Sequence, residues 1–157
     1  MRGGPASGEG RDFGKRYAYT ALGHLHKAQE VADLETVRYS GSPIALSFSE
    51  VDYKRSVMLV EVDERGRAEM RAIDYTPLCA LLTLPKYGYA SPEKLLSLLA
   101  DLPKDDGTTP RETWPYLELH VQLSQPEPEL RAKIAKLLED KAVRFCRVTT
   151  ETAKREP

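Results

Sequence analysis

The chain has 157 residues, enough for one domain of ordinary size or for one small domain with part of another. Hydrophobic residues make up 41% and charged residues 30%, yet the formal net charge is only −1. Since a freestanding duplex-binding module is usually strongly basic, this balance argues against one, and any DNA contact must be local or shared with other parts.

The chain opens with a polar leader followed by short predicted strands. Residues 1–16 are rich in glycine, with proline, serine and charges, and hold no apolar run that would serve as a signal peptide, so we expect disorder there. Tyr17–Leu22 predicts a buried strand, and Val37–Tyr39 predicts a second, shorter one. Residues 27–36 between them are interpreted as a loop or irregular turn.

A hairpin is predicted next. Ser56–Val62 is strongly β-forming, and Arg67–Tyr75 alternates apolar and charged side chains. Asp63-Glu64-Arg65-Gly66 lies between them, and Gly66 suits the positive φ of a tight turn. One face of this hairpin is expected to be partly solvated.

From residue 77 the pattern changes to alternating strands and helices. Ser91 followed by Pro92 is a good helix start, with Ser91 as the N-cap. The predicted order is β-α-β-α-β, with helices against one face of a small sheet, which is an α+β arrangement. The elements are strands at 78–84, 116–123 and 143–149 and helices starting at Ser91 and spanning 127–140; residues 151–157 are expected to be a flexible tail.

The motif with the clearest chemical content is Gly23-His24-Leu25-His26. This His-x-His pair lies at the end of the predicted strand 17–22, which places both imidazoles on one side, about 6.5 Å apart. That spacing suits one rim of a two-metal site, whose ions lie about 3.5–4 Å apart. The alternative interpretation is a pair of ordinary surface histidines, and the motif alone does not decide between them.

The surrounding sequence adds a family resemblance. Leu22–Gln29, then Tyr39-Ser40-Gly41-Ser42-Pro43, then Leu46-Ser47-Phe48 and the hairpin resemble the SbcD family of nuclease subunits, within the calcineurin-like metallophosphoesterases. The resemblance implies that residues 17–76 are the carboxy-terminal part of a metallophosphoesterase β-sandwich domain. It implies more weakly that residues 77–150 form a capping domain.

The resemblance also implies a chemistry. His24 and His26 would be metal ligands in a two-metal manganese centre, with no catalytic residue assigned. The intact enzyme would be a metal-dependent DNA exonuclease and endonuclease acting at DNA ends and hairpins in repair and recombination, with an SbcC-like ATPase as partner. The family's other four metal motifs are absent, so we expect a carboxy-terminal portion that is inactive by itself.

Two alternatives remain open. The chain could be a non-catalytic, cap-type binding module for DNA or a partner protein, or a phosphodiesterase of the same superfamily acting on small molecules. If elements that normally cover 17–22 are missing, exposed sheet surface there would favour self-association. His120 is interpreted as a solvated strand histidine.

The remaining features concern the compartment. No stretch approaches the roughly 20 apolar residues that a membrane span needs. Cys79 and Cys146 have no metal-ligand spacing and are interpreted as small core residues. We therefore expect a reducing compartment and a cytoplasmic protein.

Overall fold

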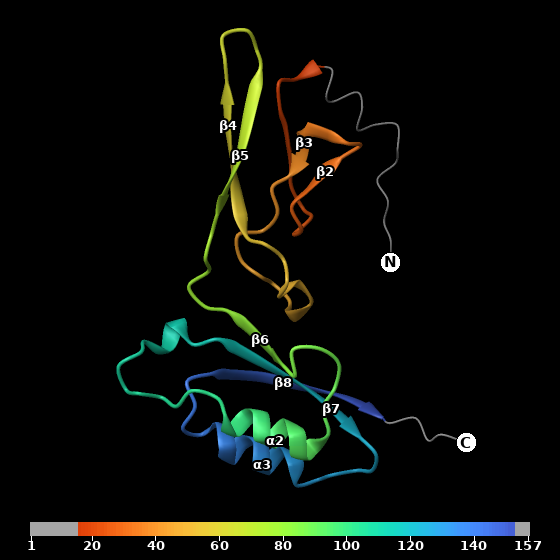
Figure 1. Ribbon diagram of the computed structural model, residues 1–157, viewed down its shortest axis with the longest axis vertical. Coiled ribbons are helices and arrows are strands. Elements are labelled where there is room, and N and C mark those ends of the chain that lie inside the picture. Colours follow the sequence, from red (N-terminus) through yellow and green to blue (C-terminus); the bar gives the residue numbers. More distant parts are fainter. Residues whose placement is uncertain (1–15, 153–157) are drawn as a thin grey trace, which may run out of the picture. The chain divides into compact units, whose positions relative to one another are not determined.

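Residues 16–152 are described in the computed structural model of the chain, and they divide into two units between Pro77 and Leu78 (Figure 1). The leader expected at 1–16 and the tail expected at 151–157 lie almost entirely outside the described residues. Among residues 16–152, no helix is both long and apolar enough to cross a membrane.

The first unit contains a small three-stranded sheet with the order β1-β3-β2. β1 (Thr20–Leu22) pairs in parallel with β3 (Leu34–Tyr39), and β2 (Gln29–Val31) pairs with β3 in the antiparallel direction. The loop expected at 27–36 is therefore wrong. Ala32 and Asp33 have φ values of 55° and 57° and turn the chain back, so that β2 and β3 form a hairpin.

The second part of this unit is the hairpin of β4 (Ser56–Val62) and β5 (Ala68–Asp74), which confirms the prediction. Gly66 has the expected positive φ, 74°. One carboxylate oxygen of Asp63 accepts hydrogen bonds from the backbone N–H groups of Arg65 and Arg67, which fixes the turn. A short 3-10 helix, η1 (Phe48–Glu50), lies between the two sheets in sequence.

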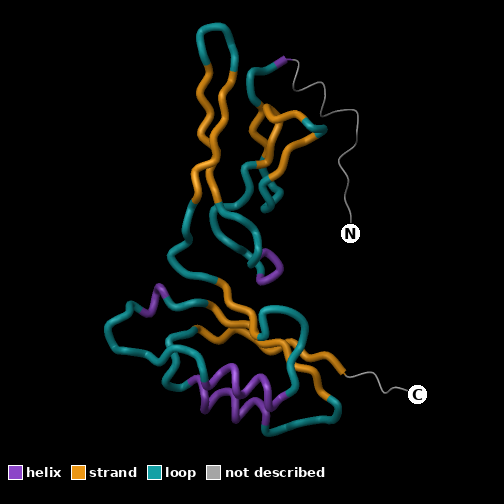
Figure 2. The backbone as a smooth tube through the Cα atoms, in the orientation of Figure 1, coloured by secondary structure: helices purple, strands orange, loops and turns teal. Residues whose placement is uncertain are grey.

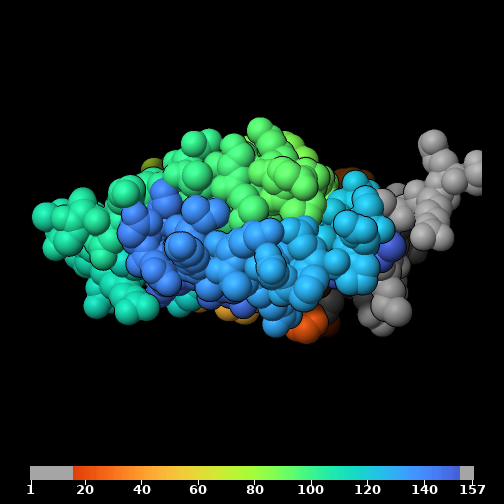
Figure 3. Space-filling view, turned by 90° about the horizontal axis from the view of Figure 1, so that it is seen from below, coloured from red at the N-terminus to blue at the C-terminus, as the bar shows by residue number. Residues whose placement is uncertain are grey.

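The second unit confirms the β-α-β-α-β order. Its three parallel strands, in the order β6-β7-β8, have both helices on one face (Figures 1 and 2). Figure 3 looks onto that helical side and shows α2 in green beside α3 in blue. The elements are β6 (Leu81–Leu84), α2 (Pro92–Ala100), the 3-10 helix η2 (Arg111–Thr113), β7 (Tyr116–Leu123), α3 (Leu130–Leu138) and β8 (Arg144–Thr152).

Apolar side chains between the sheet and the two helices form the core of the second unit. Leu117, Leu119 and Val121 alternate along β7 and are fully buried, because they face the helices. Leu95 and Leu99 of α2 and Ile134 of α3 pack against the same core. Ser91 caps α2 as predicted, accepting a hydrogen bond from the backbone N–H of Lys94.

The prediction of two core cysteines is wrong for Cys146, which is exposed, while Cys79 is half-buried. The reason is a β-bulge. Leu117 of β7 pairs with Phe145 and the next residue, Glu118, pairs with Arg147, so Cys146 has no partner in the register. The mixed sheets and helices agree with an α+β class.

Candidate functional site

His24 and His26 both lie beyond the end of β1, which stops at Leu22. His24 is exposed and has a φ of 84°, in the left-handed region that residues other than glycine seldom adopt. Strand alternation therefore does not set the relative direction of the two rings, and the geometric reason given above for pairing them is wrong.

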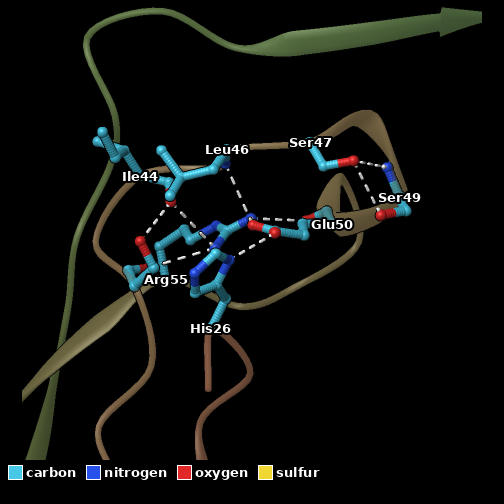
Figure 4. A network of polar contacts seen from close by, with 8 residues as sticks. His26, Ile44, Leu46, Ser47, Ser49, Glu50 and Arg55 are labelled. Atoms are coloured by element: carbon cyan, nitrogen blue, oxygen red, sulfur yellow. Dashed lines mark hydrogen bonds and ion pairs between the residues drawn. The ribbon is translucent and has the colours of Figure 1, made fainter. Parts of the chain in front are cut away.

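His26 contacts a carboxylate from a distant part of the chain. Its Nδ1 lies 2.7 Å from Oε1 of Glu50, the last residue of η1 (Figure 4). Glu50 is buried, whereas the His26 side chain keeps 41% of its surface accessible. One nitrogen of the ring is thus held inside the unit while the ring itself stays partly open.

Glu50 is itself fixed from two sides. Its Oε2 accepts a hydrogen bond of 3.2 Å from the backbone N–H of Leu46 and lies 3.6 Å from Nη2 of Arg55. Arg55 is also buried and donates to the carbonyl oxygens of Ser42, Ile44 and Glu50 (Figure 4). The guanidinium therefore ties the 42–50 loop together around the carboxylate.

The contacts of Glu50 favour its ionised form. The hydrogen bond to His26 is the largest cause that holds the pKa of the Glu50 carboxyl below its ordinary value, and burial opposes it. The N–H of Leu46 and the charges of His26 and Arg55 lower the pKa further. An ionised carboxylate can only accept hydrogen bonds, and this affects which nitrogen of the His26 ring carries the proton.

The Gly41-Ser42 segment places the 42–50 loop against the histidine segment. The N–H of Ser42 donates to the carbonyl oxygen of His26 at 3.0 Å. Gly41 has a φ of 82°, and a Cβ there would lie 2.9 Å from the backbone nitrogen of Ala28. Only glycine allows this close approach, so the tight turn after β3 is required for Glu50 to reach His26.

The donor set suits one side of a metal site. A histidine ligand characteristically has one ring nitrogen held by a carboxylate and the other directed at the metal, and the His26–Glu50 contact provides the first half of that arrangement. Within residues 16–152, however, no group of three or more His, Cys, Asp or Glu side chains is placed to hold a metal ion. A metal site at His24 and His26 would therefore need further ligands beyond these two side chains.

The third histidine lies in the second unit and is not solvated as expected. Nε2 of His120 lies 3.2 Å from Oε2 of Glu118, and its ring stacks on Tyr89 with 5.1 Å between centroids. Glu118 is 3% exposed and also accepts hydrogen bonds from Arg147 and Thr149. The side chain of His120 is only 23% accessible, because this polar cluster covers it.

Comparison with known proteins places these features in a family. The SbcD_C family, described as the type 5 capsule protein repressor C-terminal domain, matches residues 78–157. Three curated relatives are named as the SbcD component of the SbcCD nuclease. That of Rhodobacter capsulatus is 35% identical over 137 residues, which is 87% of this chain and 33% of the relative.

The other two relatives match at different lengths. The protein of Escherichia coli K12 is 29% identical over 138 residues, 88% of this chain and 32% of the relative. That of Bacillus subtilis is 56% identical over 45 residues, 28% of this chain and 12% of the relative. The chain thus spans about a third of the length of the relatives that it matches over most of its own length.

Proposed function

The chain belongs to the SbcD family, of which it represents the carboxy-terminal part, and from this we propose that it contributes a metal-binding edge and a cap to a nuclease. The whole protein would hydrolyse phosphodiester bonds at DNA ends and hairpins, in repair and recombination, with an SbcC-type ATPase as partner. The relatives' shared name, which makes each of them part of the SbcCD nuclease, supports this assignment.

The observation that carries the proposal is the contact between His26 and Glu50. A carboxylate on Nδ1 leaves Nε2 as the nitrogen available to a metal ion, and the ring is partly accessible. Imidazole is a preferred ligand of zinc and iron, whereas manganese prefers oxygen ligands, so a manganese centre would need carboxylates beside these two histidines. When bound, a two-metal centre supplies a hydroxide at neutral pH and polarises the phosphoryl oxygens.

The residues of this chain have a limited part in that chemistry. Glu50 and Arg55 orient His26, while His24 adds a second imidazole from an exposed, left-handed backbone position. Two imidazoles leave most coordination positions of two metal ions unfilled, and neither can bridge the two ions as a carboxylate does. We therefore expect the 157-residue chain to bind Mn²⁺ weakly and to hydrolyse nothing alone.

Paramagnetic broadening by Mn²⁺ tests this proposal directly. In a ¹⁵N-labelled sample, the ring signals of His24 and His26 should broaden at a lower Mn²⁺ concentration than the signal of His120. Variants His24→Gln, His26→Gln and His120→Gln assign the three rings. Equal broadening of all three, or none at His24 and His26, would contradict the metal assignment.

An activity assay tests the incomplete site. The chain is mixed with Mn²⁺ and a linear duplex that has a labelled end, and no release of nucleotides is expected. Release that His24→Ala abolishes would show that this chain holds a complete centre.

The second candidate function is a non-catalytic cap that binds DNA. It is favoured by the family match to residues 78–157, which coincide with a unit that has its own core. Fluorescence anisotropy with a short duplex at several salt concentrations tests it, because phosphate contacts make affinity fall with salt. A flat signal at the lowest salt would exclude DNA binding and leave a partner protein as the ligand.

A further inference from the structure

We propose that Glu50 is a positioning residue that fixes the tautomer of His26, with the proton on Nδ1 and the lone pair on Nε2. The inference rests on the proposed function only where it names a metal ion as the ligand of Nε2. The tautomer itself is a property of this chain and can be measured without metal.

The hydrogen bond sets the direction of the proton. Nδ1 of His26 and Oε1 of Glu50 are 2.7 Å apart, so one of them must donate. The carboxylate of Glu50 already accepts from the N–H of Leu46 and lies beside the guanidinium of Arg55, so it is the acceptor and Nδ1 is the donor. In water the neutral imidazole carries its proton mainly on Nε2, so the contact reverses the ordinary preference of the ring.

The position of the carboxylate is fixed by the surrounding backbone. Its second oxygen accepts from the N–H of Leu46, and Arg55 lies 3.6 Å from the same oxygen. Arg55 donates in turn to three carbonyl oxygens between residues 42 and 50. Glu50 is 8% exposed, and a different rotamer would give up these partners without gaining contact with water (Figure 4).

In this arrangement the 42–55 segment holds the Glu50 carboxylate against the ring of His26. The segment carries a carboxylate across 24 residues of sequence to one nitrogen of one ring. A carboxylate on the far nitrogen also raises the basicity of the ligating nitrogen, and loss of such a partner typically weakens metal binding about 10- to 100-fold. The Arg55–Glu50 pair thus orients the ring of His26.

His120 provides an internal control with the opposite geometry. There the nitrogen near the carboxylate is Nε2, 3.2 Å from Oε2 of Glu118. When that ring is neutral, its proton belongs on Nε2. The same chain should therefore contain two neutral histidines in opposite tautomers: His26 against the ordinary preference of the ring, and His120 in agreement with it.

Long-range ¹H–¹⁵N correlation spectra of the ¹⁵N-labelled chain identify both tautomers. The spectra are recorded without metal, at a pH at which both rings are neutral. The expected result is a protonated Nδ1 in His26 and a protonated Nε2 in His120. A protonated Nε2 in His26 would overturn the inference before any variant is made.

The variant Glu50→Met removes the acceptor with little change in volume, and Glu61→Met is the matched control on the exposed surface of β4. In folded E50M the His26 proton should move to Nε2, and half-broadening by Mn²⁺ should need about 10- to 100-fold more metal. E61M should change neither. An unchanged tautomer in E50M would overturn the inference. Absence of Mn²⁺ broadening in the wild type, with the stated tautomers, would contradict the proposed function alone.

Discussion

Gly41 occupies a position that has no room for a side chain. A Cβ would lie 2.9 Å from the backbone nitrogen of Ala28 and 3.1 Å from the carbonyl oxygen of His26. These are backbone atoms of the histidine segment, which cannot rotate away as the end of a flexible side chain can. The packing of one glycine therefore controls how closely the loop that carries Glu50 approaches His26.

Gly41→Ala should destabilise the first unit more than Gly66→Ala does. Both residues have positive φ, 82° and 74°, which costs a non-glycine residue about 1–2 kcal/mol. Nothing lies within 4 Å of a Cβ at Gly66, so only G41A adds the clash, worth a further 1–3 kcal/mol or so. Urea unfolding followed through amide signals of residues 16–77 measures both, and equal losses would contradict the assigned contact.

Lys141→Met should destabilise the second unit. The buried ammonium donates to the carbonyl oxygens of Ala100 and Leu102 at the end of α2, at 2.6 and 2.8 Å. Removing it leaves two acceptors without a donor, at a cost of about 1–3 kcal/mol. Urea unfolding followed by the fluorescence of Trp114, the chain's single tryptophan, measures the loss. The exposed Lys136→Met is the control, and equal midpoints would contradict the role of Lys141.

For single residues, the sequence predicts which side chains are candidates for the site better than it predicts which residues they contact. His24 and His26 follow from a short motif, but the reason from strand alternation fails because β1 ends at Leu22. Glu50 is 24 residues from His26, and no periodic pattern distinguishes it from other acidic residues. A contact of that range depends on the Gly41 turn and on Arg55, which only the folded chain brings together.

Among the elements, the loop before η2 is ordered by the carboxylates of Asp105, which accepts from the N–H of Gly107, and Asp106. Asp106 accepts hydrogen bonds from the backbone N–H groups of Thr108 and Thr109, both at 2.8 Å, and from the hydroxyl of Thr109. The N–H of Thr109 is the largest cause that lowers the pKa of Asp106 to about 2. These bonds replace regular secondary structure in a polar segment that the sequence identifies only as a loop.

The order of this loop should therefore depend on pH in the acid range only. Because the pKa of Asp106 in the fold is below its ordinary value of 3.8, its contribution is complete above that value and is lost as pH falls through about 2. A carbon-13 NMR titration of the carboxyl should give a midpoint near pH 2, and the Thr108 and Thr109 amide signals should shift with it. A midpoint close to the ordinary value would contradict the capping role.

Elements with strong local signals are predicted well. Ser91-Pro92 gives the start of α2, and the alternation of β7 gives both its bounds and its buried face. β2 is missed because its turn uses Ala32 and Asp33 at positive φ, where the sequence has no glycine to indicate a hairpin. The parallel pairing of β1 with β3 is likewise set by the fold and not by either segment alone.

For the whole molecule, the two units differ in how they are stabilised. The buried apolar side chains of the second unit all come from residues between 90 and 143 and form one cluster. A chain that begins at Leu78 should therefore fold by itself, with a urea midpoint read from Trp114 close to that of the intact chain. A broad, non-cooperative transition of this fragment would show that its core is insufficient.

The first unit has far fewer buried apolar side chains to stabilise it. Among its described residues 16–77, the buried apolar side chains are Val31, which is 7% exposed, and Val37, which is fully buried. When a molecule binds only the ordered form of this unit, part of its binding free energy is used to order the unit. Under the proposed function, the apparent Mn²⁺ affinity of the His24–His26 edge should then rise when the unit is stabilised elsewhere, because metal binding and folding of this segment would be one coupled equilibrium.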